Sequence, residues 1–295
     1  MAKTAAIFPA KGIGDALLMM VASHRLLQEG YRVTTHHSSL EELKTWFPGH
    51  LFSSDPLPHG NTDLIIVQND NSPKIPTLKR AFQEKLSIFY PTYQRGKHLP
   101  LSLLDQVFDF SKPMAENIAF GIARLLRSHQ VSKNNGLSPP EDLIYQKHKN
   151  QVIIHPTSSA EAKNWKKKSY IRLGLKLKKR GFTPIFALSP KEREEWIECE
   201  KYAIEMPLFE TLADIAKAIY ESGLLIGNDS LLGHLASNLH IPTLIIADNH
   251  ERMKLWRPGW LMGEVVTPPA WIPKHFRQKH WKTLITVNKV LAKLP

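Results

Sequence analysis

The sequence contains a single cysteine, Cys199, among its 295 residues. No disulfide can form within the chain, so the fold does not depend on an oxidising compartment. No uninterrupted apolar run approaches the roughly 18 residues that span a bilayer. The apolar stretch 16–22 directly follows Asp15 and has helical spacing, which favours the first helix of a globular fold over a signal peptide. We therefore predict a cytoplasmic location.

Acidic residues are scarce relative to basic ones. The chain has 27 Asp and Glu against 39 Lys and Arg, which gives a net charge of +12 at pH 7 and a pI near 9.6. This excess predicts a negatively charged substrate or partner. Hydrophobic residues make up 42% and charged residues 22%, which excludes a disordered or collagen-like chain. At about 150 residues per domain, the length predicts two domains.

Strand and helix patterns alternate in both halves of the chain, and this predicts a parallel α/β sheet in each half. In the first half we predict strands at 5–8, 31–35 and 64–67, and helices at 16–29, 77–88 and 114–128. In the second half we predict strands at 151–154, 184–188, 224–227 and 243–247, and helices at 170–180, 191–201, 212–219, 231–239 and 281–293.

The polar segment 130–150 contains Asn-Asn-Gly and Pro-Pro and is the best candidate for a linker. It separates a predicted domain at 1–145 from a second at 151–280. Ligands of open α/β sheets bind outside the carboxyl ends of the strands. We therefore expect the chemistry at those edges, in a cleft between the two domains.

The first stretch that could carry chemistry is Lys11-Gly12-Ile13-Gly14-Asp15, between a predicted strand and helix. Its glycines allow a tight turn and a close approach of another molecule. Asp15 can cap the free amides of the helix, or it can act as a general base. Leu17 stands where a dinucleotide fingerprint needs a third glycine, and no Walker loop is present. Both absences argue against nicotinamide and nucleoside-triphosphate enzymes.

The second stretch runs from His155 through Thr157 and Ser158 to Lys163 and Trp165. Hydroxyl side chains and backbone amides after a strand can donate to an anion, and the lysine adds a positive charge. An ordinary polar loop would have the same composition. Residues 163–180 hold nine basic residues and no acidic one. This run indicates a solvated helix face, or a face turned to a membrane or nucleic acid.

The third stretch, Gly227 to His234, lies where a strand passes into a helix, and its amides favour a phosphate. Asp229, Ser230 and His234 suggest a hydrolase triad, but the Gly-x-Ser-x-Gly pattern of a nucleophile elbow is absent. No His or Cys cluster has metal-ligand spacing, so we predict no metal site.

In this order and spacing, the three stretches resemble glycosyltransferase family 9, the ADP-heptose:lipopolysaccharide heptosyltransferases. The signatures are Gly14-Asp15 after a strand, then Lys163-x-Trp165 after the hydroxyl residues, and then 229–234 followed by a strand that Pro242 leads. The resemblance covers almost the whole chain and is strongest over 151–246. The chain departs from the family at Leu231, where the family has glycine, and at 247–249, where it often has Gly-Pro-Thr.

The resemblance implies an α/β fold of the GT-B arrangement, with two Rossmann-like domains facing each other across a cleft. The domain at 1–145 would bind the acceptor, and the domain at 151–280 would bind the nucleotide-sugar donor. The final helix, 281–295, would pack back on the first domain. The implied reaction transfers a heptose from ADP-heptose to a lipopolysaccharide core acceptor, with inversion and without a metal or other cofactor.

The resemblance also assigns roles to particular residues. Asp15 matches the family's general base, and we place Lys11, Gly14 and Arg95 on the acceptor side. Lys163 would stabilise the leaving diphosphate and would act in catalysis together with Asp15. The implied donor-binding residues are Thr157, Ser158, Lys163, Glu192, Asp229, Ser230, Leu232 and His234.

The implied partners are a nucleotide-sugar donor and a phosphorylated, lipid-linked saccharide acceptor, with no nucleic acid. The basic surface would hold the protein peripherally at the anionic inner face of the inner membrane. Two alternatives stay open. One is a related transferase that uses a UDP- or GDP-linked sugar. The other is a non-catalytic binder of nucleic acid or of an anionic surface, although no nucleic-acid module is evident.

Overall fold

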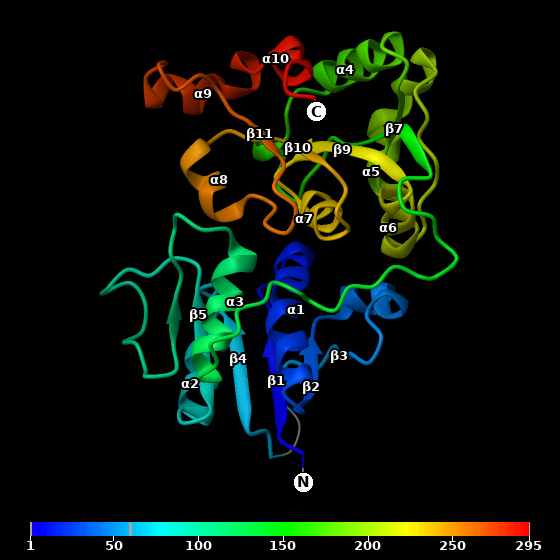
Figure 1. Cartoon of the computed structure of the whole chain (residues 1–295). Coiled ribbons are helices and arrows are strands. Elements are labelled where there is room, and N and C mark those ends of the chain that lie inside the picture. Colours follow the sequence, from blue (N-terminus) through cyan, green and yellow to red (C-terminus); the bar gives the residue numbers. More distant parts are fainter. Residues whose placement is uncertain (1, 59–60, 295) are drawn as a thin grey trace. The chain divides into compact units, whose positions relative to one another are not determined.

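The computed structural model describes residues 2–58 and 61–294. The chain divides into two compact units, Met1–Ser138 and Pro139–Pro295. Each unit is built on one parallel sheet with helices on its faces (Figure 1). The expected α/β class with two Rossmann-like domains is thereby confirmed.

The first unit has a six-stranded sheet in the order β3-β2-β1-β4-β5-β6. Its strands are β1 (Thr4–Phe8), β2 (Arg32–His36), β3 (Leu51–Ser53), β4 (Leu64–Gln68), β5 (Leu86–Tyr90) and β6 (Gln106–Val107). Its helices are α1 (Ile13–Gln28), the 3-10 helix η1 (Ser38–Trp46), α2 (Lys74–Phe82) and α3 (Met114–Leu125). All the strand pairs are parallel, so the carboxyl ends of the strands share one edge.

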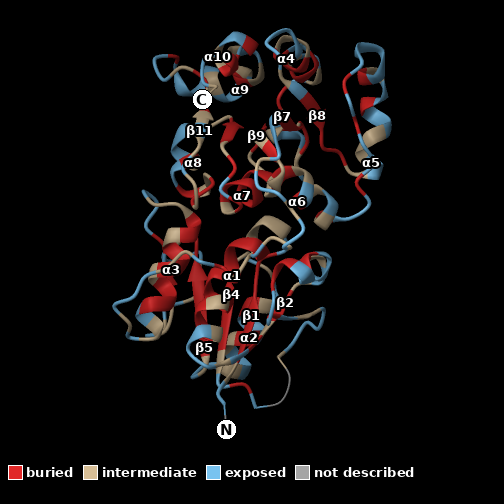
Figure 2. Cartoon of the chain, turned by 45° about the vertical axis from the view of Figure 1, so that its right-hand side comes forward, coloured by how far each residue is buried: buried red, intermediate tan, exposed pale blue. Residues whose placement is uncertain are grey.

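The core of the first unit lies on both faces of this sheet, and its three central strands, β1, β4 and β5, are buried almost throughout (Figure 2). Helix α2 covers one face, where Ile75 and Leu78 pack against Phe8, Val67 and neighbouring apolar side chains. Helices α1 and α3 pack against each other. With both faces covered, the strands become continuous apolar runs.

The helix predicted at 77–88 is wrong in its second half. Helix α2 ends at Phe82, and Leu86–Tyr90 forms β5, all five residues of which are buried. A strand buried on both faces has no alternation of apolar and polar residues, so its sequence is hard to distinguish from a buried helix. The helix predicted at 114–128 is confirmed, with its end at Leu125.

The second unit has a five-stranded parallel sheet in the order β11-β10-β9-β7-β8. Its strands are β7 (His148–His155), β8 (Thr183–Phe186), β9 (Ser222–Asn228), β10 (Thr243–Ile246) and β11 (Glu264–Val266). Its helices are η2 (Glu161–Lys163), α4 (Lys167–Lys179), α5 (Pro190–Arg193), η3 (Glu194–Tyr202), α6 (Leu212–Tyr220), α7 (Leu231–Asn238), α8 (His250–Trp256), α9 (Lys274–Leu284) and α10 (Val287–Leu291). The helix predicted at 191–201 is therefore one α-turn followed by a 3-10 helix.

The C-terminal helices belong to the core of the second unit. Trp281, Ile285 and Val290 are buried in one cluster with Val152 and Leu244 of the sheet. Helices α4, α9 and α10 lie on one side of this sheet, and α6 and α7 lie on the other (Figures 1 and 2). The expectation that residues 281–295 also pack back on the first domain stays a prediction. Their apolar side chains complete the cover that α4 provides over β7, β9 and β10.

Within residues 2–58 and 61–294, no helix combines the length and the apolar character that a membrane crossing requires.

Candidate functional site

The carboxyl edge of the first sheet holds Asp15 in a fixed orientation. Asp15 lies in the first turn of α1, where a carboxylate interacts favourably with the helix dipole. Gln68, the buried last residue of β4, donates from Nε2 to Asp15 Oδ1 at 2.5 Å. Gln68 is itself held, since its Oε1 accepts from the backbone of Ala10 at 3.4 Å. A Cβ at Gly12 would lie 2.6 Å from Asp15 Oδ2, so the glycine makes room for the carboxylate.

The other residues predicted on the acceptor side make less specific contacts. Lys11 is exposed, and its carbonyl accepts from His37 Nε2 at 3.2 Å. Gly14 lies within the first turn of α1. Arg95 is exposed in a turn at Gly96, whose φ is +84°. Lys11 and Gly14 are thus close neighbours of Asp15 in the sequence. Arg95 has no ion-pair partner among the described residues.

Asn228 organises the carboxyl edge of the second sheet. It is fully buried at the end of β9 and donates from Nδ2 to the Pro156 carbonyl at 2.7 Å. Its Oδ1 accepts from the Trp165 backbone at 3.0 Å and from the Tyr170 hydroxyl at 2.8 Å. These bonds fasten the segment between β7 and α4, which includes Lys163, onto β9.

Ser158 and Trp165 are used within this segment. The Ser158 hydroxyl lies 2.7 Å from Asn164 Oδ1 and 2.9 Å from the Ala160 carbonyl. Trp165 is buried, and its Nε1 donates to the Ile285 carbonyl at 3.1 Å. Both side chains therefore hold the loop in shape, and Ser158 is less available to an anion than the sequence suggests.

Asp229 joins two cations from distant parts of the chain. Its Oδ2 lies 3.4 Å from Lys163 Nζ and 3.1 Å from Arg252 Nη1. Arg252 also reaches Asp248 Oδ1, at 3.0 Å from its Nη2. The cluster thus holds two cations and two carboxylates, and it is electrically balanced rather than purely cationic. Lys163 is still partly exposed and has N–H groups left for a phosphate.

Two buried polar atoms at this edge lack a hydrogen bond within the described part of the chain. They are Ser230 Oγ and His234 Nδ1. Ser230 is the N-cap of α7, but its side chain does not cap the helix. Buried polar groups in native proteins are nearly always paired. These atoms, together with the free amides of the first turn of α7, therefore point to a polar ligand.

Glu192 is held by a capping box. Its Oε2 accepts from the Ser189 amide at 2.8 Å and from the Ser189 hydroxyl at 2.7 Å. Burial opposes ionisation of Glu192, but the Ser189 and Thr157 hydroxyls outweigh it, so the pKa of this carboxyl lies below its usual value. Glu192 is therefore a fixed anion beside Thr157, in a position compatible with binding a donor hydroxyl.

His234 and Leu232 are buried on α7. Burial lowers the pKa of His234, Asp229 opposes this, and Lys163 lowers the pKa further. The imidazole is therefore neutral at pH 7 and can donate or accept a hydrogen bond. Leu232 is only 3% exposed. Its side chain belongs to the core, so only its backbone is left for a ligand.

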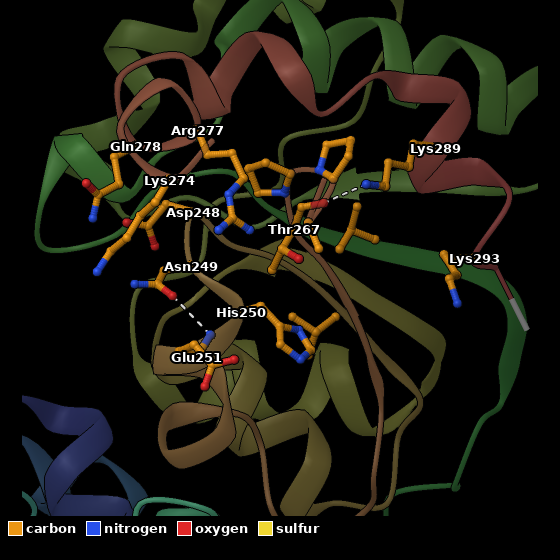
Figure 3. Close-up of a pocket in the computed structure, with 15 residues that line it drawn as sticks. Asp248, Asn249, His250, Glu251, Thr267, Lys274, Arg277, Gln278, Lys289 and Lys293 are labelled. Atoms are coloured by element: carbon orange, nitrogen blue, oxygen red, sulfur yellow. Dashed lines mark hydrogen bonds between the residues drawn. The ribbon is translucent and has the colours of Figure 1, made fainter. Parts of the chain in front are cut away.

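A pocket of about 530 Å³ adjoins this cluster at the carboxyl ends of β10 and β11 (Figure 3). Asp248 lines it and connects it to Arg252. The Lys289 ammonium donates to the Thr267 carbonyl at 2.6 Å, and Arg277 projects toward the same space. Burial, and to a lesser extent the nearby Lys293, lower the pKa of Lys289.

The structure thus brings together the predicted donor-side residues 157–163, Glu192 and 229–234 along one sheet edge. The sequence did not predict three contacts at these edges: the Arg252 ion pair with Asp229, the hydrogen bonds of Asn228, and the Gln68 hydrogen bond to Asp15. No group of three His, Cys, Asp or Glu side chains is arranged to hold a metal ion within residues 2–58 and 61–294.

Comparison with solved structures shows the fold over nearly the whole chain. Escherichia coli ADP-heptose lps heptosyltransferase II is 17% identical with a TM-score of 0.70, over 99% of this chain and 97% of that one. A glycosyl transferase family 9 protein from Veillonella parvula DSM 2008 is 14% identical with a TM-score of 0.68, over 99% and 96%. E. coli heptosyltransferase WaaC with ADP is 13% identical with a TM-score of 0.60, over 98% of each chain. These likenesses confirm the expected GT-B class.

A further solved structure, the dodecameric glycosyltransferase TibC from E. coli, is described as iron-containing. It is 13% identical with a TM-score of 0.60, over 99% of this chain and 75% of that one. No curated protein sequence matches the chain.

The family model "Glycosyltransferase family 9 (heptosyltransferase)" matches residues 98–258, more than half of the chain. The chain is therefore a glycosyltransferase and belongs to glycosyltransferase family 9.

Proposed function

We propose that this enzyme transfers a heptose from ADP-heptose to a saccharide of a lipopolysaccharide core, with inversion at the sugar carbon. One observation carries the donor half of the proposal. Ser230 and His234 each bury a polar atom without a hydrogen bond among the described residues, along the sheet edge that holds Lys163. A nucleoside diphosphate supplies acceptors for such donors.

The departing diphosphate develops negative charge as the sugar–phosphate bond breaks. Lys163 and Arg252 lie together at Asp229, and the amides of α7 begin next to Ser230. Preorganised donors of this kind stabilise the charge as it forms, and the loss of one typically costs about 10²–10³ in rate. We propose that these groups perform this task without a metal or other cofactor.

Asp15 is the proposed base. It would take the proton of the acceptor hydroxyl while that oxygen attacks the anomeric carbon, and Gln68 would keep the carboxylate oriented. The proposed acceptor is a phosphorylated, lipid-linked saccharide, with Lys11, Gly14 and Arg95 on the acceptor side. We also propose a cytoplasmic location with peripheral contact to the anionic inner face of the membrane, and no nucleic-acid partner.

The first test is turnover of Asp15→Asn with ADP-heptose and a lipopolysaccharide acceptor that lacks heptose. Release of ADP should fall by about 10²–10⁴, the usual contribution of a general base, while ADP binding measured by calorimetry stays the same. The anomeric configuration of the product, read by NMR, should be inverted. An Asp15→Asn enzyme of near-normal rate would remove the base assignment.

The second test concerns the donor. ADP should raise the thermal midpoint more than UDP or GDP does, because a ligand that binds only the folded state stabilises it. Lys163→Ala should weaken ADP binding in calorimetry. A stronger response to UDP or GDP would favour the related transferase that uses another nucleotide-sugar.

A further inference from the structure

The helices on one side of the second sheet form a layer without acidic residues. Residues 163–180, which include α4, hold nine Lys and Arg, and residues 265–294, which include α9 and α10, hold six. The two segments carry 15 of the 39 basic residues of the chain and none of its 27 acidic residues. They pack together as α4, α9 and α10 in Figure 1. The basic run at 163–180 is therefore one part of a larger cationic surface.

A groove of about 350 Å³ lies where α4 meets the connection between α9 and α10. Four cations line it, namely Lys166, Arg172, Lys176 and Lys282, and none of the residues that line it is acidic. We call it the α4–α10 groove.

The lysines of the α4–α10 groove have neutral partners. Lys166 donates to Thr283 Oγ1 and Lys176 donates to Asn288 Oδ1, both at 2.7 Å. Lys282 donates to the Glu161 carbonyl at 3.0 Å. An ammonium has three N–H donors, so each lysine keeps donors for another acceptor. Arg172 is exposed and has no ion-pair partner within the described residues.

Four like charges in one groove repel one another, and anions relieve this repulsion. Elsewhere in this unit, Lys163 and Arg252 are balanced by Asp229 and Asp248. Among the described residues that line the α4–α10 groove, no carboxylate provides such a balance. An anion from outside would supply it.

Exposed aromatic residues accompany this charge. Trp271 is 84% exposed just before α9, and Phe276 is 49% exposed within it. Phe276 precedes Thr283 by seven residues, which is two helical turns, so both lie on one face of α9. Thr283 lines the α4–α10 groove. Binding of soluble phosphate does not require large apolar side chains, whereas aromatic residues beside basic ones are typical of a membrane interface.

We propose that the α4–α10 groove binds the phosphate of an anionic lipid headgroup, while Phe276 and Trp271 enter the interface beside it. This inference gives a place to the membrane contact proposed above. It does not depend on the transfer reaction, so loss of vesicle binding and loss of transferase activity are separate results.

The test is co-sedimentation of the full chain with phosphatidylcholine vesicles, with and without phosphatidylglycerol. Arg172→Gln/Lys176→Gln should bind the anionic vesicles about 25-fold more weakly, because each basic residue at such a surface contributes about fivefold. The matched control, Lys201→Gln/Lys217→Gln, removes two exposed cations from η3 and α6 and should bind normally. Lys176→Arg should keep most of the binding.

Further arms separate the sources of the anion. Phe276→Ala should also weaken vesicle binding, and inorganic phosphate should compete only weakly. Thermal midpoints of all variants should match that of the parent, which excludes misfolding. Equal losses in the control pair would overturn the proposal, because net charge alone would then explain the binding. Preferential binding of a single-stranded oligonucleotide, or of free phosphate, through Arg172 and Lys176 would overturn it as well.

Discussion

Gln68 Nε2 donates to Asp15 Oδ1 at 2.5 Å, although the two residues are 53 positions apart in the chain. The contact exists because β4 pairs with β1, which brings the last residue of β4 next to the turn after β1. Gly12 completes the arrangement, since any Cβ there would meet the other carboxylate oxygen. Gln68 and Gly12 thus both contribute to the orientation of the Asp15 carboxylate.

Gly12→Ala should lower activity without unfolding the protein. Gly12 has an ordinary φ of −75°, so the backbone tolerates alanine, and the change at a helix N-cap should cost at most about 1 kcal/mol. The new Cβ would displace the Asp15 carboxylate, and we expect kcat to fall about tenfold or more. Steady-state kinetics and thermal unfolding check this. Gly30→Ala is the counterpart, because its φ of +81° should reduce stability with little effect on kcat. A Gly12→Ala enzyme with normal kcat would show that the position of Asp15 is not critical.

Arg252→Gln should weaken ADP binding. Without Arg252, Lys163 becomes the sole cation at Asp229 among the described contacts, and it would be drawn toward that carboxylate and away from a phosphate. We expect roughly a tenfold loss of affinity, about 1.4 kcal/mol, measured by calorimetry. Lys254→Gln, two residues further along the same helix, removes an exposed cation paired with Glu251 and should bind ADP normally. Equal affinities for Arg252→Gln and the parent would contradict this reading of the cluster.

The sequence predicted most strands, because short apolar runs bounded by turns are a local signal. It also predicted that 157–163 and 229–234 lie at strand ends, and the structure places them on one edge. The ion pair between Arg252 and Asp229 could not be predicted. No local pattern in His250–Trp256 indicates a partner more than twenty residues away. Pairings of this kind arise from the strand order, which no local pattern encodes.

The packing of the C-terminal helices on the second sheet could not be predicted for a related reason. The side chains of Trp281, Ile285 and Val290 have an amphipathic spacing that shows one face is buried, but not which core covers it. The helices pack where they do because α4 alone does not cover this face of β7, β9 and β10. The hydrogen bonds of Gln68 and Asn228 were likewise not predictable, because a polar residue at a strand end acquires its partners only in the folded chain.

Gly136→Ala should destabilise the first unit. Gly136 has a φ of +80°, and a Cβ there would lie 2.6 Å from His24 Nδ1 and would also collide with the His50 ring. Backbone strain and overpacking together should lower the free energy of unfolding by about 2–4 kcal/mol, measured by denaturant titration. Gly181→Ala has a φ of +84° but nothing near its Cβ, so it should cost about 1–2 kcal/mol. Equal losses of unfolding free energy in the two variants would show that the His24 and His50 side chains move aside at little cost.

The stacked pair of His24 and His50 should make stability depend on pH. Their ring centroids are 5.3 Å apart, and His24 Nδ1 and His50 Nε2 are buried without hydrogen-bond partners in the described chain. Burial lowers the pKa of both imidazoles, and His50 lowers the pKa of His24 further. The unfolded chain therefore takes up more protons than the folded chain once the pH falls below about 6.5, and the free energy of unfolding decreases as the solution is acidified.

His50→Gln should make this dependence shallower between pH 6.5 and 5, because one titrating group is removed from that window. Each proton taken up on unfolding changes the free energy by about 1.4 kcal/mol per pH unit, and this bounds the expected difference in slope. Denaturant titrations at several pH values measure it. His129→Gln is the control, because His129 is an exposed histidine of the same unit and its removal should leave the slope unchanged. If His50→Gln and the parent lose stability in parallel over this range, the buried pair is not the origin of the pH dependence.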